Sequence, residues 1–439
     1  MKKYIFLIAV LAFSGGIFAQ QSWSLRDCID YALKHNIQIQ KQEIANEQQK
    51  VDLNTAKNKR LPNLNGGMSQ DFGFGRVTSG QDNSIVTNTQ SSSNRFALNT
   101  SIPVFTGFQI PNNIELCKLN LQAATEDLNK AKEDISVSVT SAFLQVLFNE
   151  ELCKVAKEQI SLSKEQLDRI TRLEEVGKAA TAQVYEAKAN LAQDELSSVQ
   201  AENTRQLAVL DLTQLLELPS PEGFSVVFPE MEPSLLTLTT PEDIYSQAMI
   251  SKPAVLAAQY RLAGMEKSIK IAKGAYYPTL SFNGEIATSY YTDTKNRGQG
   301  FGTQLDQRLN QSLGLSLSIP IFNRFDTRNK VKIARLQYSN QALQLEESKK
   351  GLYKEIQQAY YNAVAAQAKF TSSKTAVEAS EESFKLMQQK YENGKATSVE
   401  FNQVKVNLMK ASSERIQAKY DYLFRTKILD FYKGITLAQ

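Results

Sequence analysis

The chain is short of the residues that most catalytic and metal sites require. It has one histidine, His35, and three cysteines, Cys28, Cys117 and Cys153, in 439 residues. His35 lies in a polar helical pattern without a second histidine or a carboxylate at metal-ligand spacing, so we expect it on the surface. The cysteines are odd in number and lack metal-like spacing, which favours buried thiols and leaves a disulfide between two of them open.

Short catalytic motifs are absent as well. The sequence contains no GxSxG, no Walker-type loop and no HExxH, the signatures of serine hydrolases, nucleotide-binding proteins and zinc proteases. Paired acids such as Glu346 and Glu347 fall on polar helix faces, where solvated carboxylates are usual. The sequence therefore predicts no enzyme, no metal site and no cofactor.

An excess of charge of one sign is lacking too. The 50 Lys and Arg residues nearly balance the 46 Asp and Glu residues, which leaves a net charge of +4. Proteins that bind nucleic acids or strongly acidic partners usually carry a much larger positive excess. The balance therefore predicts no nucleic-acid partner.

Long hydrophobic runs are scarce, although 42% of the residues are hydrophobic. Residues 1–19 begin with Lys2 and Lys3, continue through an apolar stretch and end at Ala19, a pattern typical of a secretory signal peptide. This stretch is shorter than the ~20 residues of a membrane-spanning helix, so an uncleaved anchor is the less favoured alternative. Because no later run is longer, the exported chain is expected to be soluble or to cross a membrane by strands.

What the chain does contain is an internal duplication with an offset of 216 or 217 residues. The segments that recur include DCIDYA (27–32) as DIYSQA (243–248), AKNKRLPNL (56–64) as AKGAYYPTL (272–280), SIPVF (101–105) as SIPIF (318–322), and EEVGKAAT (174–181) as YENGKATS (391–398). A near-constant offset indicates one architectural unit that occurs twice. We expect a first structural repeat at 20–217, a Pro-rich linker at 218–242 and a second repeat at 243–439.

Each repeat contains a pair of runs in which apolar and polar residues alternate. The four runs cover residues 63–75, 95–105, 279–291 and 311–321. Their length is close to the ~9–11 residues of a tilted transmembrane strand, and the long polar linkers 76–94 and 292–310 suit external loops. The pattern predicts one membrane β-hairpin per repeat, at 63–105 and 279–321, with a soluble sandwich as the alternative. Four strands cannot close a barrel, so other copies must contribute strands: two copies would give eight and three would give twelve.

Very long helical patterns follow the hairpins. Residues 107–176 and 324–393 contain no strong helix stop, and about 70 residues correspond to roughly 105 Å of helix. Each pattern ends near a glycine, Gly177 or Gly394, that can cap a helix in the left-handed conformation. Returning helices at about 181–217 and 398–433 are half as long, and helices at 24–60 and 243–276 would supply the other half of each rod.

With its signal peptide, duplication, SIPVF and SIPIF strand exits and two glycine-centred tips, the chain resembles the TolC-like outer membrane efflux protein family. The resemblance implies a mainly α fold with transmembrane β structure and two internal repeats. Each protomer would give four strands and long helices to a trimeric 12-stranded outer-membrane β-barrel that continues as a 12-helix periplasmic α-barrel. The protein would then lie in the cell outer membrane and extend into the periplasm.

The resemblance also implies a function and partners. The protein would be the passive exit duct of a tripartite efflux system, fed by a periplasmic adaptor (membrane fusion) protein and an inner-membrane pump of the RND or ABC type, and surrounded by outer-membrane lipid. A type I secretion exporter of proteins is the alternative with the same duct. A non-conducting structural coiled coil of the envelope is the alternative of another class, which leaves the strands unexplained.

Site residues follow from the family pattern of the tips. The positions that would dock onto the adaptor are Val176, Gly177, Lys178, Thr181, Gly394, Lys395 and Thr397. Lys178 departs from the pattern, since family members often carry an apolar residue after the first tip glycine. Acidic residues beyond the second tip ring the closed pore in the family, which makes Glu400 a pore-constriction candidate with a solvated helix-face carboxylate as the alternative.

Two glutamines and one arginine mark further departures from the pattern. Gln403 occupies the next inward position after Glu400, and Gln183 stands in the first hairpin where the pattern has an acid. Both are the remaining constriction candidates. At the strand exits, PVFTGF becomes PIFNRF with Arg324 in place of Gly107, so we expect the first turn there to differ.

Overall fold

The computed structural model describes residues 22–78, 85–228, 238–294 and 299–437. The predicted signal peptide and residues 229–237 of the predicted linker lie outside the described residues. The chain divides into two compact units, each assembled from both halves of the sequence. We call them the helical unit (Met1–Lys41, Asn129–Lys252 and Lys350–Gln439) and the sheet unit (Gln42–Leu128 and Pro253–Lys349).

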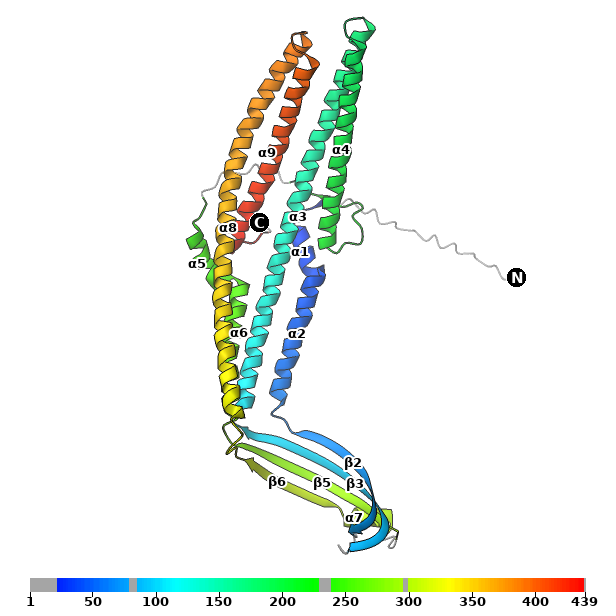
Figure 1. Cartoon of the computed structure of the whole chain (residues 1–439), viewed down its shortest axis with the longest axis vertical. Helices are drawn as coiled ribbons and strands as arrows, with labels where there is room; N and C mark the ends of the chain where they lie inside the picture. The colour runs from blue at the N-terminus through cyan, green and yellow to red at the C-terminus, as the bar shows by residue number, and fades with distance from the viewer. Residues whose placement is uncertain (1–21, 79–84, 229–237, 295–298, 438–439) are drawn as a thin grey trace, which may run out of the picture. The chain divides into compact units, whose positions relative to one another are not determined.

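The helices of the two sequence halves correspond one to one (Figure 1). In the first half these are α1 (Leu25–His35), α2 (Ile37–Asn58), α3 (Gln109–Glu175) and α4 (Thr181–Leu215). In the second half they are α5 (Pro241–Ser251), α6 (Pro253–Gly274), α8 (Asp326–Glu392) and α9 (Ser398–Tyr432). Every start and end recurs 216 or 217 residues later, so the offset read from the sequence is also the offset of the structure.

The sheet unit contains four antiparallel strands in the order β2-β3-β5-β6. They are β2 (Asn63–Thr78), β3 (Ile85–Thr106), β5 (Thr279–Asp293) and β6 (Asn310–Ser318). Leu98 lies opposite Ile286 and Leu280 opposite Leu317, so the apolar residues of neighbouring strands share one face. That face is uncovered in a single chain, with Leu313 78% and Leu64 68% exposed.

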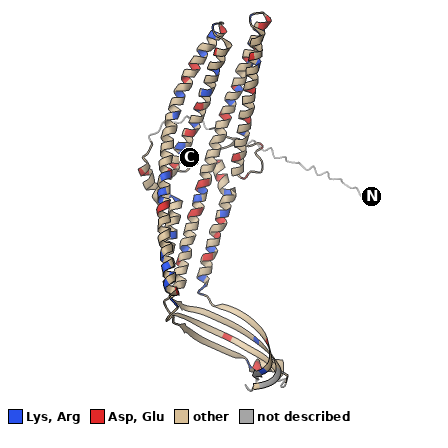
Figure 2. Ribbon diagram, in the orientation of Figure 1, with Lys and Arg blue, Asp and Glu red and all other residues tan. Residues whose placement is uncertain are grey.

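The opposite face of the sheet is polar. Arg95 forms an ion pair with Glu285, and the Ser101 hydroxyl donates a hydrogen bond to Asn283 Oδ1 at 2.8 Å. Figure 2 shows the sheet almost free of charged residues, whereas the helices carry both signs along their length. The predicted alternation of apolar and polar residues therefore corresponds to two chemically distinct faces.

Several strand boundaries and one loop differ from the sequence prediction. β3 begins at Ile85 rather than near residue 95. The residues that precede position 95 pair with β2 and extend the antiparallel ladder to the pair of Ile85 with Thr78. β6 ends at Ser318, two residues before Pro320, which lacks a backbone N–H for the ladder. The predicted 292–310 loop contains a short helix, α7 (Phe301–Gln307), whose buried Gln304 donates to the Tyr291 carbonyl at 3.0 Å and accepts from the Tyr291 N–H at 3.1 Å.

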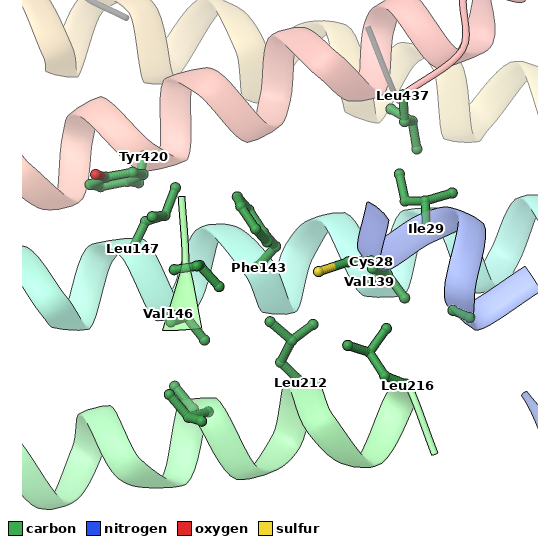
Figure 3. Close-up of a cluster of buried hydrophobic side chains, with 14 residues drawn as sticks. Cys28, Ile29, Val139, Phe143, Val146, Leu147, Leu212, Leu216, Tyr420 and Leu437 are labelled. Carbon is green, nitrogen blue, oxygen red and sulfur yellow. The ribbon is translucent and has the colours of Figure 1, made fainter. Parts of the chain in front are cut away.

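The helical unit has a continuous apolar core where α1, α3 and α4 meet (Figure 3). Fully buried members include Cys28, Val139, Leu147 and Leu212, and Leu437 near the chain end packs into the same cluster. A two-residue strand, β1 (Ser22–Trp23), pairs in parallel with β4 (Ser225–Val226) beside this core. No helix in the described part of the chain combines the length and the apolar character needed to cross a membrane.

The half-length helices are each broken once, at Asn36 and at Lys252, which the sequence prediction treated as helix interior. Both residues are buried and extended, with ψ angles of 127° and 124°. Asn36 Nδ2 donates to the Leu215 carbonyl at 3.0 Å, and its Oδ1 accepts from the Gln38 N–H at 2.9 Å. Each break thus follows from the local chemistry: an Asn that caps the next helix, and the residue before Pro253, which is driven away from helical angles.

The strand-to-helix junctions contain a second matched pair, Gly107 and Arg324. Their φ angles are 60° and 54°, and the following residues, Phe108 and Phe325, both have φ of 63°. The expected difference between the two turns is therefore wrong for the backbone. Glycine is required only at the first junction, because a Cβ on Gly107 would lie 2.2 Å from the Gly274 carbonyl oxygen.

Candidate functional site

The first tip joins α3 to α4 and contains the first group of predicted docking residues. α3 ends at Glu175, and Gly177 has a φ of 71°. The Lys178 N–H donates to the Leu173 carbonyl at 2.7 Å and the Gly177 N–H to the Glu174 carbonyl at 2.8 Å, which closes the helix end. Val176 is 66% exposed, so the apolar side chain points into solvent at the end of the hairpin.

The second tip, between α8 and α9, has the same backbone geometry. Gly394 has a φ of 70°, and the Lys395 N–H donates to the Lys390 carbonyl at 2.8 Å. Thr397 caps α9, since its hydroxyl accepts from the Glu400 N–H at 3.2 Å. The structure therefore brings the predicted residues of each tip together on one exposed turn.

The three constriction candidates have different surroundings. Glu400 closes a capping box, because its carboxylate accepts from the Thr397 N–H at 2.8 Å and from the Thr397 hydroxyl at 2.9 Å. These bonds lower the pKa of Glu400 below its ordinary value. Gln183 occupies the same position in the first hairpin and accepts from the Ala180 N–H at 3.3 Å, while Gln403 donates to Asn407 Oδ1 at 3.2 Å.

Two contacts join the hairpins close to their tips. Arg169 of α3 donates to the Glu392 carbonyl at the end of α8, at 2.9 Å. Ser398 at the start of α9 donates to Glu186 of α4, at 2.9 Å. The two tips are therefore connected by charged side chains rather than by apolar packing alone.

A buried polar cluster lies deeper between the same helices, and sequence reasoning missed it. Lys405 Nζ of α9 donates to Asp194 of α4 at 2.9 Å and to the Ser163 hydroxyl of α3, which also bonds Asp194. The Lys405 side chain is 6% exposed and that of Asp194 15%. One feature of the sequence could have pointed to this cluster. Lys405 follows Phe401, which is buried, by four residues and so lies on the apolar side of α9.

A further connection ties α9 to α3 at Glu151. Glu151 of α3 accepts from Lys419 Nζ at 2.9 Å and from the Tyr420 hydroxyl at 2.7 Å. Burial and the Glu151 charge both raise the pKa of Tyr420, so its hydroxyl stays a donor at all physiological pH values. Together with the contacts above, charged groups hold α9 against the first hairpin along much of its length.

His35 and the three cysteines differ in exposure: Cys28 and Cys153 are buried, as expected, whereas Cys117 is only partly buried. His35 is exposed and lies against Tyr31, with ring centroids 4.1 Å apart. The three cysteines are free thiols, and burial raises the pKa of Cys28 to about 12. Among the residues that the structure describes, no group of three His, Cys, Asp or Glu side chains is placed to hold a metal ion.

A family comparison identifies this architecture. Residues 28–217 and 244–431 match the model of the family described as outer membrane efflux protein. The chain belongs to this family. It is accordingly an outer-membrane protein of the TolC kind, and its family is one of channels rather than of enzymes.

Individual relatives and solved structures agree with the family assignment. Outer membrane protein TolC of Escherichia coli (strain K12) is 24% identical over 436 residues, 96% of this chain and 84% of that protein. Proteases secretion protein PrtF of Dickeya chrysanthemi is 18% identical over 433 residues, 96% and 90% of the two chains. The Campylobacter jejuni CmeC outer membrane channel matches with a TM-score of 0.79 at 16% identity, over 94% of this chain and 87% of that chain, and so has the same fold.

Proposed function

We propose that this family member is the outer-membrane exit duct of a tripartite efflux system. It would work as a homotrimer that receives substrates from a periplasmic adaptor and an inner-membrane pump, and that conducts them passively to the exterior. The observation that carries this proposal is the sheet of the sheet unit, with its exposed apolar face and polar opposite face, in a chain that also carries two long helical hairpins. An apolar face outside and a polar lumen inside are what a membrane pore requires.

Edge strands supply the argument for assembly. In the described residues β2 pairs only with β3 and β6 only with β5, so each has one edge of unpaired backbone groups. Such edges are not tolerated in a bilayer, and β6 of one copy can pair with β2 of the next. Three copies of a four-stranded sheet would close a barrel of twelve strands.

The duplication predicts the register between copies. Within one chain, Asn99 of β3 pairs with Glu285 of β5. β6 is the repeat of β3 at an offset of 217, so Ser316 corresponds to Asn99. β2 is the repeat of β5 at an offset of −216, so Ser69 corresponds to Glu285. Ser316 of one copy is therefore expected opposite Ser69 of the neighbouring copy. The same shift puts Leu317 opposite Met68 and Leu313 opposite Phe72, so apolar side chains again share one face.

Cysteine cross-linking tests this register in membranes. In a background without the native cysteines, Ser69→Cys with Ser316→Cys is expected to form a disulfide between copies, since directly opposed strand residues lie about 4.5–5.5 Å apart. Ser69→Cys with Ser318→Cys is the matched control, on the same face but two residues out of register. Equal cross-linking of both pairs, or of neither, would reject the register.

Channel recordings test the duct itself. The purified chain in planar lipid bilayers is expected to form trimers with a stable conductance, and the absence of both would reject the proposal. If Glu400 lines the constriction, Glu400→Gln should change conductance or cation selectivity. Glu378 is an exposed acid on α8, and Glu378→Gln is the control. If both variants give the same recordings as the native protein, Glu400 acts in helix capping alone.

Adaptor docking by the tips calls for a separate measurement. A photo-cross-linking residue at Val176 or Lys395 is expected to capture the periplasmic adaptor, identified by mass spectrometry. The same residue at the exposed Lys164 of α3, away from the turn, is the control. Capture at Lys164 as strong as at the tips would remove the docking role.

Protein secretion is the second candidate, favoured by the similarity to the proteases secretion protein PrtF over 96% of this chain. Deletion of the gene separates the two functions. Loss of a secreted protein from the medium with unchanged drug sensitivity would favour secretion, and increased drug sensitivity with an unchanged medium would favour efflux.

A further inference from the structure

A cationic pocket opens in the sheet unit between the end of α6 and the first turns of α8. Its volume is about 580 Å³, and its lining includes Lys273, Tyr276, Tyr277, Arg328, Lys332 and Arg335. No carboxylate is among the lining residues. Figure 2 shows the basic residues that gather along the start of α8.

The three basic residues of α8 form a stripe. Positions 328, 332 and 335 are spaced by four and three residues, so their side chains share one helix face, and all three are exposed. In the described part of the chain none of the four lining cations forms an ion pair; Asp326, the nearest acid on α8, pairs with Lys330 at 2.6 Å. The pocket therefore holds positive charge that no described acidic residue of the chain neutralises.

Aromatic side chains connect this pocket to the apolar face of the sheet. Tyr277, which lines the pocket, makes an edge-to-face contact with Phe108, with ring centroids 6.0 Å apart. Phe108 contacts Phe105 in the same way, with ring centroids 5.2 Å apart. Phe105 lies opposite Leu280, a member of the apolar face. The pocket thus begins where the apolar surface ends, with tyrosines between the two, as at a membrane–water boundary.

We infer that this pocket binds the headgroup of an anionic phospholipid of the periplasmic leaflet. The inference rests on the proposed function, in which the apolar face meets the acyl chains. Arg328 and Arg335 can each offer a bidentate donor pair to a phosphate, while Lys273 and Lys332 contribute point charges. A basic pocket next to a transmembrane surface is a recurrent site for anionic headgroups.

Lipid association in vesicles tests the inference. The full-length protein is reconstituted in phosphatidylcholine, and its association with spin-labelled phosphatidylglycerol is measured relative to spin-labelled phosphatidylcholine. We expect roughly a threefold to tenfold preference for phosphatidylglycerol, which the variant Arg328→Gln/Lys332→Gln/Arg335→Gln reduces towards one. The control Lys354→Gln/Lys369→Gln/Lys374→Gln removes the same charge from exposed positions of α8 in the helical unit and should keep the preference.

The outcomes separate the lipid site from its competitors. Protein that inserts and conducts but shows no preference, or a preference that both triple variants lose equally, overturns the inference and leaves the duct intact. Loss of the preference in excess inorganic phosphate would assign the pocket to soluble phosphate. A lining variant that no longer forms trimers would assign the surface to contacts between copies, and protein that fails to insert would overturn the duct and the lipid site together.

Discussion

Lys405 of α9 and Asp194 of α4 form a 2.9 Å ion pair whose two side chains are 6% and 15% exposed. The pair joins helices of the two hairpins, and Ser163 of α3 completes its hydrogen bonds. A buried ion pair of this kind is costly to split, because the remaining charge keeps its desolvation penalty. Loss of either side chain would therefore weaken the contact between the two hairpins.

Lys405→Met should destabilise the protein by about 3–5 kcal/mol, since Asp194 would stay buried without its partner. The double variant Lys405→Met/Asp194→Leu should recover much of that loss, because both charges are then gone. Thermal unfolding in detergent measures both. Lys410→Met, at an exposed position of the same helix, is the control, and an equal effect there would reduce Lys405 to a surface residue.

The capping box of the second tip should weaken in acid. Hydrogen bonds from Thr397 lower the pKa of Glu400 below the ordinary 4.5, so the folded cap favours the carboxylate. This stabilisation is complete above the unfolded pKa and is lost as the pH falls through the lowered folded pKa. Hydrogen exchange at residues 397–400, corrected for intrinsic rates, should accelerate below about pH 4.

The first tip provides the matched control for that experiment. Gln183 takes the place of the acid there, so exchange at residues 180–183 should show no corresponding acid-induced acceleration. Glu400→Gln should abolish the difference between the tips. Equal acceleration at both tips of the native protein would show that acid acts elsewhere.

The two strand-to-helix junctions should respond oppositely to substitution. Gly107→Arg should prevent correct packing, because even a Cβ there would meet the Gly274 carbonyl oxygen at 2.2 Å. Arg324→Gly should be neutral or stabilising by up to about 1 kcal/mol, since a left-handed angle costs a non-glycine residue about that amount. Folded yield and thermal unfolding measure the pair, and similar losses in both would contradict the steric argument.

Asn36 should contribute more to stability than its neighbours. Asn36→Ala removes the bond to the Leu215 carbonyl and the cap of α2, at a cost of about 1–3 kcal/mol. Lys34→Ala, two residues away and exposed, should change stability by less than about 0.5 kcal/mol. Urea unfolding of the two variants side by side tests this. Equal midpoints would mean that the hydrogen bonds of Asn36 do not contribute to stability.

Features encoded in short stretches could be read from the sequence. The alternation around Leu313 and Leu315 predicted an apolar strand face, and Gly177 and Gly394 predicted left-handed turns, because period and φ are local properties. The break at Lys252 had such a signal as well. Pro253 restricts the residue before it, whereas the long helical pattern on both sides favoured continuity.

Long-range pairings could not be read in the same way. Lys405 and Asp194 are 211 residues apart, and each resembles the many solvated charges of a helix face until the hairpins are placed together. The cationic pocket needed the same information, because Lys273 and Arg328 belong to different helices with two strands between them. Glu400 is an intermediate case. The sequence placed it just beyond the second tip, but did not predict that its carboxylate caps α9.

The unequal junctions have a consequence for how the protein is made. Gly107 meets Gly274 within one chain, while the proposed ring would bring Arg324 against Asn58 of the neighbouring copy. The first contact forms during folding, at fixed effective concentration, and has backbone against backbone. The second can form only when separate chains encounter each other, so assembly should be a concentration-dependent stage that is slower than the folding of one chain.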